Sequence, residues 1–171
     1  MNKIHIRDIL AKYDIDINDV SLGDFDYIGE YTAKKERDRN SPLFHSVGAF
    51  FRPNYERGIL IYSLIKKFKL TSYLEVGFGR GYSAVCAAKA FYDIGVDGKV
   101  TTIDPNFDQE QIQMMSQVFP REWLEKIELK PGLSQEVLKT LDGNWDFVYI
   151  DGDHRAEAVR QDWNLLKDRW N

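Results

Sequence analysis

Residues 75–81 decide the fold that the sequence predicts, because they place a glycine-rich turn directly after a short apolar segment. They read Glu75-Val76-Gly77-Phe78-Gly79-Arg80-Gly81. Alternate glycines let a backbone adopt conformations that other residues avoid, and they let a ligand approach it closely. An alanine-rich helical segment follows from Tyr82 and presents its N-terminus to the same turn. We therefore expect a strand, a ligand-binding turn and a helix in direct succession.

Short apolar segments and helical segments alternate through the rest of the chain. The predicted strands are residues 71–76, 100–104, 127–130 and 147–150. The predicted helices are one that begins after Pro53, then residues 82–93, 109–119, 134–141 and 155–167. The inner face of the last helix is expected to carry Ala158, Val159, Trp163 and Leu166. This order is typical of an α/β fold with a parallel sheet and helices on both faces, which we assign to residues 54–171.

Length, charge and composition exclude several classes of protein and of binding partner. A chain of 171 residues suits one domain, and its net charge of −4 argues against a surface that binds nucleic acid. No apolar stretch is long enough to span a bilayer, and the charged residues within 1–10 argue against a signal peptide. The single cysteine, Cys86, lies among alanines and is expected in the core. We expect a cytoplasmic protein.

The first 53 residues have no regular period and are interrupted by Pro42 and Pro53. Apolar residues between these prolines are able to pack onto the sheet. The segment is therefore expected to form a cover over one end of the sheet or a lid that contacts substrate, and the cover is slightly favoured.

The spacing of the glycines separates two classes of cofactor. A dinucleotide-binding turn requires Gly-x-Gly-x-x-Gly, and Tyr82 stands where its third glycine would fall. The observed Glu-x-Gly-x-Gly-x-Gly instead resembles motif I of the class I S-adenosylmethionine-dependent methyltransferases. Carboxylates at Glu75 and at Asp104, which ends the next strand, also suit a cationic sulfonium ligand better than a pyrophosphate.

The resemblance implies a set of cofactor-binding residues. They are Glu75 at the methionine end, Gly77, Gly79 and Gly81 in the turn, Asp104 on the ribose hydroxyls and Ser134 beside the adenine. Two of these have simpler interpretations. Glu75 is alternatively a surface carboxylate at a strand end, and Ser134 is alternatively the N-cap of its helix.

A second polar stretch, Ile150-Asp151-Gly152-Asp153-His154, follows the strand at 147–150. It is either an ordinary turn or part of the site, and its place after an apolar strand favours the site. It resembles the Ile-Asp-Gly-Asp-His segment of a methyltransferase group related to small-molecule O-methyltransferases, whose metal-dependent members carry Asp-Ala-Asp-Lys. The resemblance implies that Asp151 is a catalytic residue and a ligand of a Mg²⁺-like cation. It also implies that His154 is the general base.

Class I methyltransferases continue after the helix that corresponds to residues 155–167 with a fifth strand and then an antiparallel pair. The sheet expected here therefore lacks these C-terminal strands. The outer edge of the strand at 147–150 would then need a cover. The sequence is expected to be a piece of a longer protein; the alternatives are pairing with a second copy or another chain, and cover by residues 1–53.

Three functions are weighed. The first is methylation of an oxygen, less readily of a nitrogen, on a small molecule. The second is a cofactor-binding fragment or regulatory module without turnover, and a nicotinamide-dependent oxidoreductase is a distant third.

Overall fold

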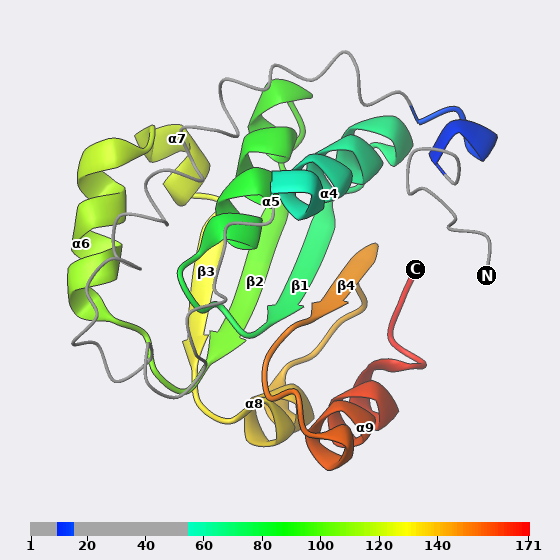
Figure 1. Cartoon of the computed structure of the whole chain (residues 1–171), viewed down its shortest axis with the longest axis vertical. Coiled ribbons are helices and arrows are strands. Elements are labelled where there is room, and N and C mark those ends of the chain that lie inside the picture. Colours follow the sequence, from blue (N-terminus) through cyan, green and yellow to red (C-terminus); the bar gives the residue numbers. More distant parts are fainter. Residues whose placement is uncertain (1–9, 16–54) are drawn as a thin grey trace.

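The computed structural model describes residues 10–15 and 55–171, and it contains the expected parallel sheet. Four strands lie in the order β3-β2-β1-β4, and every pair of neighbours is parallel. Their bounds are Ser72–Val76 for β1, Lys99–Asp104 for β2, Ile127–Pro131 for β3 and Phe147–Ile150 for β4. Figure 1 shows the strands side by side, with their carboxyl ends along one edge of the sheet.

The helices divide between the two faces of the sheet. Their bounds are Tyr55–Phe68 for α4, Tyr82–Asp93 for α5, Gln109–Val118 for α6, Arg121–Leu124 for α7, Ser134–Thr140 for α8 and Ala156–Leu166 for α9. One apolar core joins α4, α5, α6 and α7 to the sheet, and a second core joins α8 and α9 to the opposite face (Figure 1). The short helix α7 was not predicted. The prediction of a parallel sheet flanked by helices is confirmed.

Strand β1 shows how the sequence supplies both cores. Side chains alternate between the faces of a strand. Tyr73 therefore packs in the core with α5, whereas Leu74 and Val76 pack in the core with α8 and α9. Glu75 lies between Leu74 and Val76 and shares the α5 face with Tyr73, which puts a carboxylate inside the sheet–helix interface.

Two of the four residues predicted for the inner face of α9 lie there, and the other two do not. Ala158 and Leu166 are buried, but Val159 is 41% exposed and Trp163 is 46% exposed. The buried residues follow a strict four-residue spacing, so Asp162 takes the inner position between Ala158 and Leu166. A carboxylate therefore lies on the inner face of α9, for which the sequence pattern predicts apolar side chains.

The predicted N-cap role of Ser134 is also wrong. Helix α8 begins after an N-cap at Leu133 that makes no side-chain capping bond. The Ser134 hydroxyl instead donates a hydrogen bond to Asp162, as described below.

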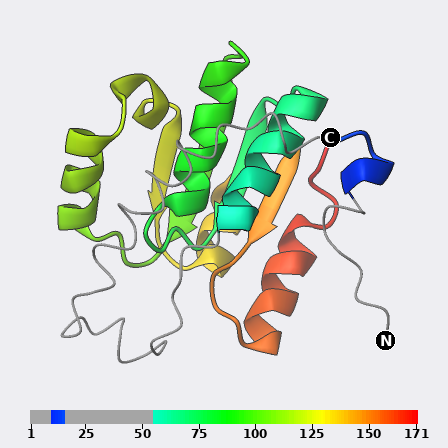
Figure 2. The same cartoon turned by 45° about the horizontal axis from the view of Figure 1, so that its top comes forward.

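Within the described part of the chain, β4 has one neighbouring strand, β1, and all four of its residues are half-buried. The last residues return to the start of this strand, as both views show (Figure 2). There Trp145 and Trp170 form an isolated parallel bridge, with Trp145 N donating to Arg169 O at 3.0 Å. Among residues 10–15 and 55–171, no further strand pairs with the outer edge of β4.

The expected cover or lid, residues 1–53, lies outside the described residues except for 10–15. Cys86 is buried as expected, and its burial raises the pKa of the thiol. Over residues 10–15 and 55–171, no helix has the length and apolar character needed to cross a membrane.

Candidate functional site

The loops after three of the strands interlock at the carboxyl edge of the sheet. Gly77 N donates to Ile103 O at 2.8 Å, Asp151 N donates to Val76 O at 2.8 Å, and Gly132 N donates to Asp104 O at 3.2 Å. These contacts bring the glycine turn, the end of β2 and the start of the Asp151 stretch to one place. Ligands of open α/β sheets bind at this edge.

The glycine turn needs its glycines for two physical reasons. Gly77, Gly79 and Gly81 have φ angles of +95°, +53° and +81°, which side chains strongly disfavour. At Gly77 space is lacking too, since an added Cβ would lie 2.4 Å from the carbonyl oxygen of Asp151 and 2.7 Å from the Cα of Gly152. The turn therefore lies flush against the Asp151 loop, and Gly81 serves as the N-cap of α5 without a side-chain capping bond.

Asp104 holds the glycine turn from the neighbouring strand. Its Oδ2 atom accepts hydrogen bonds from the backbone N–H of Phe78 at 3.0 Å and of Gly79 at 3.1 Å. Its Oδ1 atom accepts one from Asn106 N at 2.8 Å. A carboxylate has about four lone-pair sites, and Asp104 is partly exposed, so it retains capacity for a ligand hydroxyl. The sequence did not predict this anchoring of the turn.

Glu75 lies beneath the turn and is completely buried, so its interpretation as a surface carboxylate is wrong. Its oxygens accept hydrogen bonds from the hydroxyls of Ser83 on α5 and Thr102 on β2, the latter at 2.9 Å. The Tyr73 hydroxyl donates to it at 3.5 Å. Burial raises the pKa of Glu75 to about 7, although the bonds from Ser83 and Thr102 act in the opposite direction. The carboxylate therefore ties β1, β2 and α5 together under the site.

Asp151 forms an ion pair that sequence reasoning missed. Arg57, in the first turn of α4, places its Nη1 atom 2.7 Å from Oδ2 of Asp151 and 3.1 Å from the Tyr149 hydroxyl. Burial raises the pKa of Tyr149 to about 12. One sequence signal for Arg57 exists, because it precedes the buried Ile61 and Ile65 at four-residue spacing. That spacing places it on the face of α4 that packs against the rest of the protein.

The arrangement around Asp151 does not fit the implied divalent cation. In residues 10–15 and 55–171, no group of three or more His, Cys, Asp or Glu side chains is placed to hold a metal ion. Hard cations such as Mg²⁺ need several oxygen ligands. The Oδ2 atom of Asp151 already accepts a hydrogen bond from the guanidinium of Arg57.

The rest of the polar stretch forms a local turn. Asp153 accepts hydrogen bonds from the backbone N–H of Arg155 at 3.0 Å and from its guanidinium. The bond from the Arg155 side chain is the main cause that lowers the pKa of Asp153 to about 2. His154 lies between them and is exposed. Asp151 thus joins the site, whereas Asp153 follows the ordinary-turn interpretation.

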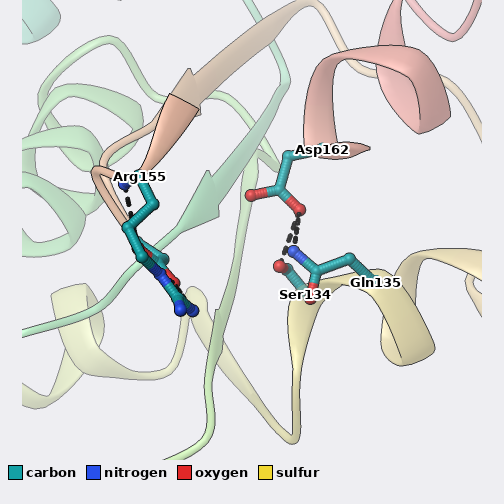
Figure 3. A network of polar contacts seen from close by, with 5 residues as sticks. Ser134, Gln135, Arg155 and Asp162 are labelled. Carbon is teal, nitrogen blue, oxygen red and sulfur yellow. Dashed lines mark hydrogen bonds and ion pairs between the residues drawn. The ribbon is translucent and has the colours of Figure 1, made fainter. Parts of the chain in front are cut away.

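Ser134 belongs to a polar network between α8 and α9 that is centred on the buried Asp162. Figure 3 shows Ser134 and Gln135 directed toward Asp162. The Ser134 hydroxyl and Gln135 Nε2 both donate to Oδ1 of Asp162, at 2.7 and 2.9 Å. Asp162 is 1% exposed, and among the described residues its Oδ2 has no hydrogen-bond partner. The network fixes the segment after β3 against the helix that follows the Asp151 loop, and Asp162 was not predicted.

Comparison with known proteins adds family information to this geometry. Residues 74–171 match the model of a family described as "Methyltransferase domain". A search of the curated proteins found no match.

Solved structures of methyltransferases share the fold. The Podospora anserina methyltransferase PaMTH1, solved with S-adenosylhomocysteine, is 21% identical; the match covers 97% of this chain and 69% of that one, with a TM-score of 0.60. TomG from Streptomyces achromogenes, an O-methyltransferase of tomaymycin synthesis solved with S-adenosylmethionine, is 22% identical (81% and 60% covered, TM-score 0.57). A Bacillus cereus O-methyltransferase in complex with S-adenosylhomocysteine is 18% identical (92% and 68% covered, TM-score 0.56).

Proposed function

The chain belongs to the family of methyltransferase domains, and we propose that it uses S-adenosylmethionine to methylate an oxygen, less readily a nitrogen, of a small molecule. Structural neighbours that are O-methyltransferases, and that were solved with S-adenosylmethionine or its product, support this choice of cofactor and acceptor. The proposal covers residues 54–171 as the cofactor-binding domain. Residues 1–53 are proposed as its cover or lid.

The observation that carries the proposal is the contact between Asp104 and the glycine turn. A partly exposed carboxylate at the end of β2 binds the backbone of Phe78 and Gly79 directly. Ribose hydroxyls donate well to a carboxylate that the protein has already oriented. Gly79, with a φ angle of +53° and no side chain, is proposed to let a nucleoside approach the backbone of the turn. The residues present therefore fit S-adenosylmethionine.

Each candidate residue has a defined task in this proposal. Asp104 accepts hydrogen bonds from the ribose, Ser134 and its network hold the segment beside the adenine, and Glu75 supports the turn at the methionine end. S-adenosylmethionine supplies, when bound, an electrophilic methyl group on a cationic sulfonium.

Asp151 and His154 are proposed to act on the acceptor. Asp151, next to Gly77, orients the acceptor hydroxyl, and His154 removes its proton, since a neutral imidazole is an effective base near pH 7. Alignment of the acceptor oxygen supplies much of the rate enhancement. No step is assigned to a metal ion, because the residues around Asp151 do not fit one.

The second candidate is a cofactor-binding module without turnover. It is favoured by the exposure of His154, because the imidazole of the proposed base is open to water in the described part of the chain. A nicotinamide-binding function is disfavoured further by Tyr82. This residue is buried, and its hydroxyl lies so close to Gly58 of α4 that an added Cβ there would be 2.3 Å away. Position 82 therefore serves helix packing.

Replacement of Asp104 by alanine is expected to weaken binding of S-adenosylhomocysteine, measured by isothermal titration calorimetry, by about 100-fold. The estimate follows from hydrogen bonds to charged groups, each worth about 1.5–3 kcal/mol. Asp104→Asn keeps one carbonyl oxygen and should lose less. Asp97→Ala is the matched control, because Asp97 is exposed just before the opposite end of the same strand. An unchanged affinity in Asp104→Ala would show that the ribose assignment is wrong.

A further inference from the structure

We infer that Arg57 is the built-in cation of the candidate site: its guanidinium neutralises and positions Asp151 and holds divalent metal ions away from that carboxylate. The inference deepens the proposed function, because it states how the acceptor side of that same site is organised. Arg57 acts through Asp151 and Tyr149, so it is a positioning residue.

The contacts of Arg57 match this role. A single nitrogen, Nη1, donates both to Oδ2 of Asp151 at 2.7 Å and to the Tyr149 hydroxyl at 3.1 Å. The guanidinium carbon also lies 5.7 Å from the centre of the Tyr149 ring. Tyr149 and Asp151 are two residues apart along β4 and its end, so their side chains leave the same face of the sheet. One planar cation therefore fixes two neighbouring side chains.

The charge of Arg57 is well maintained in this place. Its side chain is 26% exposed and that of Asp151 is 28% exposed, so both are partly shielded from water. Burial works against the charged form, but Tyr149 and Asp151 raise the pKa of Arg57 above its usual value. Buried Glu75 contributes in the same direction. The guanidinium thus stays charged in the presence of its partners.

A divalent cation would meet repulsion there. A fixed positive charge about 5 Å from a doubly charged ion costs on the order of a tenfold loss in affinity, even when water screens the pair. A bound metal also needs further oxygen ligands beside Asp151, and the described residues provide no such group. Arg57 and a metal ion are therefore alternatives at Asp151.

The position of Asp151 also affects the glycine turn, because the two segments are in close contact. The carbonyl oxygen of Asp151 lies so close to Gly77 that an added Cβ would be 2.4 Å away. The ion pair consequently fastens α4 to the loop against which the glycine turn rests. This relation connects Arg57, which lies outside every motif in the sequence, to both parts of the proposed site.

The test uses Mn²⁺ as a probe and measures its affinity for the wild-type chain by electron paramagnetic resonance. The variants are Asp151→Asn, Arg57→Gln and Arg57→Lys. We expect weak and equal Mn²⁺ affinity for the wild type, Asp151→Asn and Arg57→Lys, which keeps the positive charge. Arg57→Gln should bind Mn²⁺ about tenfold more tightly, because the repelling charge is gone while a hydrogen-bonding side chain remains.

The matched control is Arg121→Gln, which makes the same change in net charge at an exposed guanidinium paired with Glu125. It should leave Mn²⁺ affinity unchanged. Two results would overturn the inference: a wild-type Mn²⁺ site that Asp151→Asn weakens tenfold, or an Arg57→Gln variant that binds Mn²⁺ no better than Arg121→Gln. The first comparison needs no change at Arg57, so it stands even when Arg57→Gln fails to fold.

Calorimetry with S-adenosylhomocysteine on the same wild-type sample separates this inference from the proposed function. Absence of cofactor binding would overturn the proposed function. The Mn²⁺ comparison would still decide the role of Arg57.

Discussion

Replacing Gly77 by alanine is expected to abolish binding of S-adenosylhomocysteine and to lower the free energy of unfolding by about 3 kcal/mol or more. Two costs add up at this position. The φ angle of +95° strains any residue with a Cβ. The new methyl group would also lie 2.4 Å from the carbonyl oxygen of Asp151, so the turn and the Asp151 loop must move apart. Urea unfolding and calorimetry measure the two effects.

Gly143→Ala is the matched control for this prediction. Gly143 has a φ angle of +115°, but an added Cβ would meet no atom within 4 Å. It therefore isolates backbone strain, about 1–2 kcal/mol, and should leave cofactor affinity intact. Equal losses of stability and affinity in the two variants would contradict the close packing of the turn against Asp151.

Glu75→Gln is expected to remove a pH dependence of stability that amounts to about 3 kcal/mol in the wild type. The pKa of Glu75 is about 7 in the folded chain, against 4.5 for the ordinary side chain, because burial disfavours its charge. The folded state thus binds more protons than the unfolded state. Its stabilising contribution is fully present below pH 4.5, falls between pH 4.5 and 7, and is lost above that range.

Urea unfolding at a series of pH values measures this effect. The stability of Glu75→Gln relative to the wild type should rise from pH 4.5 to 7 and then stay constant. Glu128→Gln is the contrasting control. Hydrogen bonds from Lys130 and Lys99 lower the pKa of Glu128, so its contribution is lost as the pH falls. Parallel curves for the wild type and Glu75→Gln across this window would show that Glu75 is not an ionisable group of the core.

The parallel sheet with its flanking helices, and a candidate site at its carboxyl edge, could be predicted because their signals are local. The glycine spacing at 77–81 and the apolar strand before Asp151 each occupy a few adjacent residues. The rule that ligands bind at the carboxyl ends of parallel strands then joins them. Asp104 was singled out by the family resemblance, but its contacts with the turn cross from one strand to the next and were not predicted.

The residues that were missed act across long stretches of sequence. Arg57 and Asp151 are 94 residues apart, and Ser134 and Asp162 are 28 residues apart. The residues that flank Arg57 and Asp162 in the sequence do not indicate which side chain each of them contacts. Arg57 is half-buried and Asp162 is buried, each on the inner face of an amphipathic helix, so a charged residue on such a face is the useful signal. It shows that a partner exists without identifying it.

The environment of Glu75 shows a second limit. The sequence allowed a surface carboxylate or a cofactor ligand, and neither interpretation included complete burial. Glu75 lies on the face of β1 that α5 covers. Its burial depends on the packing of that helix, because Ser83 of α5 supplies one of its hydrogen bonds.

The most direct test of the central claim is a pair of calorimetric titrations of the wild-type chain, one with S-adenosylhomocysteine and one with NAD⁺. The geometry of Gly77, Gly79 and Asp104 predicts saturable binding of S-adenosylhomocysteine to one site and no binding of NAD⁺. Binding of NAD⁺ without binding of S-adenosylhomocysteine would contradict the assignment of this glycine turn to a nucleoside sulfonium.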